Sequence, residues 1–121
     1  MLIVAAVLII LIGLVHSYLG EKFILIRLFR QPLPRLFGND AFTRQTLRFV
    51  WHMTTVCWWG FAALLIGLEY GYSSKGEILL IIGTTFGIGA LFPLIATRGK
   101  HLSWLVFTAI SLICYFAAAA A

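Results

Sequence analysis

Four long apolar stretches constrain this chain more than any other feature. Each is about 17–25 residues long, the length that an α-helix needs to cross the hydrocarbon core of a bilayer. Open strands leave backbone groups unpaired in lipid, and the chain is too short for a closed barrel. The sequence therefore predicts an all-α integral membrane protein, folded as one four-transmembrane-helix bundle over residues 1–121. The expected spans are residues 2–20, 46–68, 78–96 and 102–120.

The composition supports lipid as the solvent. Of the 121 residues, 62% are hydrophobic and only 11% are charged, and the mean hydropathy is +1.02. A soluble domain this small buries only part of the apolar surface that it carries. We find no internal repeat and no segment that would form an aqueous domain.

The basic residues fall almost entirely on one side of the expected spans. Residues 21–45 and 97–101, with the adjoining span edge, hold eight of the nine, and the other side holds only Lys75. The positive-inside rule places both loops in the cytoplasm and both termini outside, as in a bacterial inner membrane. The net charge of +5 then favours contact with anionic lipid head groups over contact with nucleic acid. The eight residues are Lys22, Arg27, Arg30, Arg35, Arg44, Arg48, Arg98 and Lys100.

The first apolar stretch differs from a cleavable secretory signal. No basic residue precedes it, and Lys22 and Arg27 follow it, which predicts an uncleaved anchor. Residues 21–35 then alternate apolar and basic side chains, which predicts an amphipathic basic interfacial segment between helices 1 and 2. Pro32 and Pro34 are expected to stop it, and Asn39 or Asp40 to cap the second span.

Two kinds of stripe predict how the helices face one another. Polar residues on the second and fourth spans recur at helical spacing, so we expect them to face the bundle interior or a neighbouring subunit. Small residues on the first and third spans favour close packing within the bundle or, alternatively, homodimerisation. The polar stripes are Gln45, Arg48, His52 and Thr55, and His101, Trp104, Thr108, Ser111 and Tyr115. The small ones are Gly13, Ser17 and Gly20, and Gly83, Gly87 and Ala90. Cys57 and Cys114 lie inside spans without metal-site spacing and are expected to pack.

The three histidines lie toward the same side of the membrane in this arrangement. Imidazole nitrogens with one carboxylate are suitable ligands for zinc, copper or iron, so His16, Glu21, His52 and His101 are candidate ligands of a divalent metal. Alternatively, His16 and His52 would be axial ligands to a haem between two helices. A third reading is a structural polar cluster that binds no cofactor. No two of the three histidines have a local metal-binding spacing.

No residue pattern predicts catalysis. The chain lacks a serine–histidine–acid grouping, a phosphate-binding glycine loop and a pair of intramembrane carboxylates. We therefore expect a small accessory or structural subunit that packs in or beside a larger membrane complex, or self-associates. Trp58, Trp59 and Phe61 lie deep in the second span and would offer a broad surface to a partner.

The length and span number suggest a transporter as another class. Four spans in this length are similar in size to the small multidrug resistance exporters, which work as dimers around a carboxylate in the first helix. Here the first span has no acidic residue before Glu21, and the rest of that family's motif is absent. His16 would have to titrate in the carboxylate's place, which defines a small proton-coupled transporter as an alternative function.

Two runs in the first half of the chain carry a second resemblance. HSYLGEKFILIRLFR and FTRQTLRFVWHMTTVCWWG resemble segments of small four-helix inner-membrane proteins of bacteria. This resemblance implies a location and a span number. It implies no activity and no role for any residue.

Overall fold

The computed structural model describes residues 1–121 and is entirely helical, with four helices and no strand. Three apolar helices are long enough to cross a membrane, and the fourth, α5, is apolar but shorter, at 17 residues. Each predicted span overlaps one of these helices, and α3 begins five residues before the predicted residue 46. The elements are α1 (Leu2–Leu19), the π-helical turn η1 (Gly20–Leu25), α2 (Ile26–Leu28), α3 (Ala41–Glu69), α4 (Lys75–Ala96) and α5 (Ser103–Ala119).

The first helix is longer than predicted and contains a π-turn. α1, η1 and α2 form one continuous helical stretch from Leu2 to Leu28, and the N–H of Ile26 donates to the carbonyl of Glu21, five residues earlier. The basic segment predicted for residues 21–35 is therefore helical only to Leu28. The helix ends before Pro32, and residues 29–40 form a non-helical connector.

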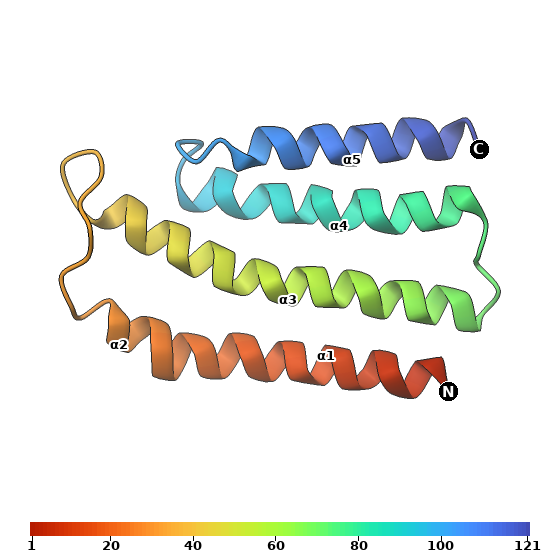
Figure 1. Cartoon of the computed structure of the whole chain (residues 1–121), viewed down its shortest axis with the longest axis horizontal. Coiled ribbons are helices and arrows are strands. Elements are labelled where there is room, and N and C mark those ends of the chain that lie inside the picture. Colours follow the sequence, from red (N-terminus) through yellow and green to blue (C-terminus); the bar gives the residue numbers. More distant parts are fainter.

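The four helices lie side by side in one open row, in the order α1, α3, α4, α5 (Figure 1). α1 contacts only α3 among the other long helices, and α5 contacts only α4. A bundle would bring a further pair of helices into contact, so the predicted four-helix bundle is not confirmed. Both termini lie at the same end of the row as the α3–α4 connector, opposite the two basic connectors.

Close approaches at glycine hold each seam of the row. A Cβ added at Gly13 would lie 2.7 Å from Trp59 Nε1, and one added at Gly60 would lie 2.5 Å from Thr85 Oγ1. In the α4–α5 seam, a Cβ at Gly83 would lie 3.0 Å from the Cβ of Cys114. The small-residue stripes therefore serve contacts within the chain, which is one of the two uses predicted for them.

The connector between α2 and α3 is tied to the start of α3. Leu36 and Asn39 form an isolated bridge around Phe37 and Gly38, both of which have positive φ. Asp40 precedes α3 without capping it through its side chain, and Asn39 Oδ1 instead accepts the N–H of Ala41 at 3.0 Å. The neighbouring Arg44 guanidinium donates to Asp40 and lowers the pKa of that carboxyl.

Little of the chain is buried in this row. Only 15 of the 121 residues are buried, and most large apolar side chains are exposed along both sides of the helices. Cys114 packs in the α4–α5 seam as predicted, whereas Cys57 is exposed. Exposed apolar surface of this extent is typical of a face that contacts lipid or another protein.

Replacing Gly20 tests the tightest helix approach. A Cβ at this position would overlap the indole of Trp51, so we expect Gly20→Ala to destabilise the fold by about 1–3 kcal/mol, although alanine favours helix. Unfolding in mixed detergent micelles measures the change. Gly76→Ala is the matched control, because its nearest neighbour, Ala118 O, would be 3.4 Å away. Equal stability of Gly20→Ala and wild type would contradict this packing.

Candidate functional site

The polar side chains between α1 and α3 form the only extended hydrogen-bonded group that joins two helices. We call it the α1–α3 polar cluster. It consists of Ser17, Glu21, Arg48, His52 and Thr55. The last three belong to the polar stripe predicted on the second span, and this stripe faces α1. Because α1 and α3 are neighbours in the row, the cluster closes one seam near the end where the basic connectors lie.

The Glu21 carboxylate is the centre of the cluster. Arg48 contacts both of its oxygens, with Nη2 2.8 Å from Oε1 and Nε 3.2 Å from Oε2. His52 Nε2 lies 3.1 Å from the same Oε2. Two donors in a fork and a third from the imidazole fix the carboxylate in one orientation. Glu21 and Arg48 thus form an ion pair between the end of the first helix and α3.

A chain of hydrogen bonds runs from His52 toward the middle of the row. His52 Nδ1 lies 3.0 Å from Ser17 Oγ, and Ser17 Oγ lies 2.8 Å from Thr55 Oγ1. Thr55 is buried, and its hydroxyl donates to the carbonyl of Gly13 at 3.2 Å. Gly13 precedes Glu21 by eight residues, so the hydrogen bonds from Glu21 to Gly13 cover about 12 Å along the helix axis.

The number of hydrogens on the His52 ring decides how the hydroxyls of Ser17 and Thr55 are oriented. When the His52 ring carries both hydrogens, Nδ1–H donates to Ser17, Ser17 donates to Thr55, and Thr55 donates to Gly13 O. Each hydroxyl then donates once and accepts once. When Nδ1 carries no hydrogen, Ser17 must donate to it, and the Thr55 hydroxyl must serve both Ser17 and Gly13. The cluster thus links the proton content of His52 to the orientation of two hydroxyls.

His16 lies beside the cluster but is held by different partners. Its ring stacks on the Trp51 indole, with centroids 4.7 Å apart and planes 1° from parallel, and Trp58 lies 4.9 Å away. His16 Nε2 donates to the carbonyl of Trp51 at 3.3 Å, and Trp51 Nε1 donates to the carbonyl of His16 at 3.1 Å. These reciprocal bonds join α1 and α3 one turn away from Glu21.

His101 lies at another place in the fold. It belongs to the α4–α5 connector, where Nδ1 is 2.8 Å from Ser103 Oγ. Its ring packs against Phe42 and Phe49 at the beginning of α3. Ser111, by contrast, donates to the carbonyl of Gly83 across the α4–α5 seam at 2.7 Å. That part of the polar stripe on the fourth span faces α4.

Of the four predicted metal ligands, the structure brings Glu21 and His52 into contact. No group of three or more histidine, cysteine, aspartate or glutamate side chains is placed to hold a metal ion. The predicted haem pair, His16 and His52, also has other partners. Coordination through His52 would have to replace its bond to Ser17 or to Glu21, and coordination through His16 Nε2 would have to replace its bond to Trp51.

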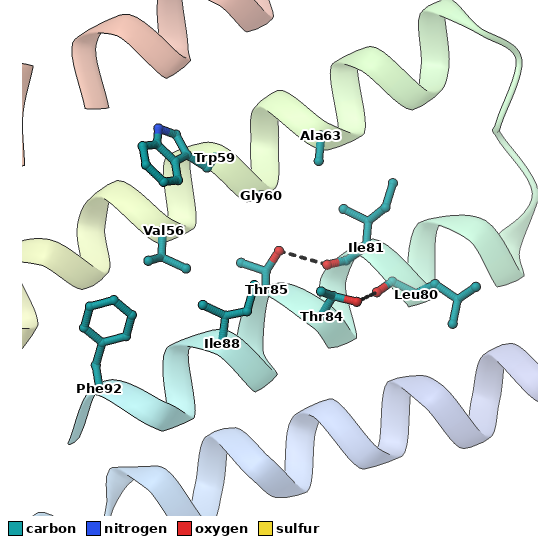
Figure 2. A pocket seen from close by; sticks show the side chains of 10 residues that line it. All are labelled: Val56, Trp59, Gly60, Ala63, Leu80, Ile81, Thr84, Thr85, Ile88 and Phe92. Atoms are coloured by element: carbon teal, nitrogen blue, oxygen red, sulfur yellow. Dashed lines mark hydrogen bonds between the residues drawn. The ribbon is translucent and has the colours of Figure 1, made fainter. Parts of the chain in front are cut away.

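An apolar groove of about 480 Å³ lies along the α3–α4 seam (Figure 2). Trp59 and Val56 line it from α3, and Ile88 and Phe92 line it from α4. Its two hydroxyls are already used within the helix, since Thr84 donates to the carbonyl of Leu80 and Thr85 to that of Ile81. The groove offers apolar contact without a free donor, which suits an acyl chain or another helix.

Two features of the site have no clear sequence signal. The π-turn at Gly20–Leu25 follows an apolar pattern that an ordinary α-helix would also satisfy. The packing of Trp51 in the α1–α3 seam depends on the absence of a side chain at Gly20. The small-residue stripe containing Gly20 was a usable sign of close packing there, but it does not name the residue that fills the space.

Comparisons with known proteins leave the description at this level. No protein-family model matches the chain, and neither a curated protein nor a solved structure matches it.

A double-mutant cycle tests whether Glu21 and His52 act together. We expect Glu21→Ala and His52→Ala to be non-additive in unfolding free energy by about 0.5–1.5 kcal/mol, the range for polar contacts between membrane helices and partly exposed ion pairs. Glu21→Ala combined with Ser111→Ala is the control. Ser111 lies in a different seam, so these two effects should add. Additivity of both pairs would refute the cluster.

Proposed function

We propose that this chain is an integral membrane protein that works as a small accessory or structural subunit, with its helix row packed against another membrane protein. The open row is the observation that supports this proposal. Each helix contacts only its neighbours, and the outer sides of α1 and α5 have no helix beside them. Such a row has two broad apolar faces and two free edges, which a partner can cover.

The charge distribution supports one orientation in the membrane. The connector at residues 29–40 and the turn at residues 97–102 lie at one end of the row, and Lys75 is the one lysine or arginine at the other. We propose that the basic end faces the cytoplasm and that both termini lie outside, in agreement with the positive-inside rule. An inner membrane of a bacterium fits this arrangement.

Few polar groups remain for chemistry on the row's faces. The ring nitrogens of His52, one nitrogen of His16 and one of His101 are bonded within the chain. The groove between α3 and α4 is apolar. An assembly role needs no free polar group, so we place it before catalysis.

Photocrosslinking in native membranes tests the assembly role. A photoreactive amino acid at Phe61 or Ile113, which are 61% and 67% exposed, should capture one defined membrane protein or a second copy of this chain. The same group at Ala62, which is 1% exposed, should give no intermolecular product. Gentle native purification with mass spectrometry and metal analysis should recover the captured protein in stoichiometric amount. A strictly monomeric protein without crosslinks would overturn the proposal.

A small proton-coupled transporter is the second candidate, and the hydrogen-bonded chain favours it. Glu21, His52, Ser17 and Thr55 are connected by hydrogen bonds without a gap. A proton could pass along such a chain by reorientation of the hydroxyls. The hydrogen-bonded chain includes His52 and not His16. We therefore propose His52, in place of His16, as the residue that carries the proton.

Flux measurements distinguish this candidate from the assembly role. If protons move through the cluster, liposomes containing the protein should show pH-driven flux that His52→Ala and Glu21→Gln reduce to the level of protein-free liposomes. His16→Ala should retain the flux, because His16 is outside the hydrogen-bonded chain. Wild-type liposomes that are no leakier than empty ones would exclude the transporter.

A further inference from the structure

Two cations lie over one aromatic ring on the side of the first helix that faces away from α3. Lys22 Nζ is 5.3 Å from the centroid of Phe23, and the Arg27 guanidinium carbon is 5.5 Å from the same centroid. Lys22 also lies within 3.3 Å of the Tyr18 hydroxyl. Tyr18 and Phe23 are 62% and 45% exposed, and α1 is an edge of the row. This group therefore lies on the outer surface of the row, at its α1 edge.

The π-turn reduces the angle between Lys22 and Arg27 around the helix axis. Lys22 and Arg27 are five residues apart, which in an uninterrupted α-helix would place them about 140° apart around the axis. A π-turn closes with bonds between residues five apart and so aligns such residues on one side. Both residues lie in or just after η1, so the turn gives them a shared face while Leu25 is buried on the other.

No carboxylate within the chain neutralises this pair. The chain has four acidic residues, and each has other partners. Glu21 binds Arg48 and His52, and Asp40 binds Arg44. Glu69 binds the N-terminal ammonium, and Glu77 forms the capping box of α4 with Ser74. Lys22 and Arg27 are therefore available to bind an anion from outside the chain.

We propose that Lys22, Arg27 and the Tyr18 hydroxyl form a binding site for the phosphate of an anionic phospholipid, with an acyl chain running along the outer side of α1. Lysine and arginine donate to phosphate oxygens. The net negative charge of the lipid favours a site with two cations. The exposed apolar side chains of α1 that follow toward the N-terminus, including Val15 and Leu11, provide the surface for the chain. The site rests on the proposed membrane insertion and is independent of the accessory role.

Lipid titration of the purified full-length protein tests the site. Native mass spectrometry in mild detergent gives the dissociation constants of short-chain phosphatidylglycerol and of phosphatidylcholine. Phosphatidylglycerol should bind more tightly, Lys22→Gln or Arg27→Gln should weaken it about fivefold, and the double variant should weaken it about 25-fold. Lys22→Arg should retain the affinity. Arg30→Gln with Arg35→Gln is the matched control, since it removes the same charge at the same end and should change the affinity less than twofold.

Each other outcome has a definite meaning. Equal binding of both lipids, or equal loss in the two double variants, would show a diffuse charge effect and overturn the site. Displacement of the lipid by inorganic phosphate at comparable concentration would show an anion site without lipid specificity and overturn the lipid assignment. Flotation with phosphatidylcholine vesicles is measured first. A protein that does not float would refute membrane insertion itself, whereas one that floats without preferring phosphatidylglycerol would refute only this inference.

Discussion

With the membrane insertion that we propose, the fold depends on how apolar helices attract one another in an apolar solvent. Burial of apolar surface gives no advantage in lipid, so association of helices depends on close packing at small residues and on polar contacts between helices. Both occur only along the three seams, at pairs such as Gly60 with Thr85 and Gly83 with Cys114. No comparable contact joins α1 to α5, and nothing else would draw the row into a closed bundle. An open row is the consequence.

The α1–α3 seam is the one seam in which charged groups take part. The α2–α3 connector between these helices is longer than the other two, so it restrains their relative position less. The Glu21 carboxylate with its three donors and the reciprocal bonds of His16 and Trp51 supply the missing restraint. A cluster that holds two helices together and a cluster that conducts protons need the same contacts. They differ in whether the hydroxyls of Ser17 and Thr55 reorient during function.

The sequence was sufficient for the helices and for the helix faces that carry the polar residues, because apolar length and helical periodicity determine both. It predicted that His52 and Arg48 share a face, and α-helical spacing alone is enough for that. It could not predict the open row, since the pattern of Gly13 and Gly20 is equally suitable for a bundle. It could not predict the separation of His101 from His52 either, because that depends on which side of α3 each imidazole lies. His101 packs on Phe42 and Phe49, whereas His52 faces α1.

The charges connect the fold to its surroundings. Only Arg44 and Arg48, among nine lysine and arginine residues, contact a carboxylate. The other seven cannot be neutralised from within, because the chain's four acids are already bonded elsewhere. Six of the seven lie at the end of the row that holds the basic connectors. In the membrane that we propose, phosphates of anionic lipids would balance this positive charge, which is concentrated at one end and unmatched inside. The same distribution would orient the chain in a membrane, and it supports the lipid site that we propose beside the π-turn.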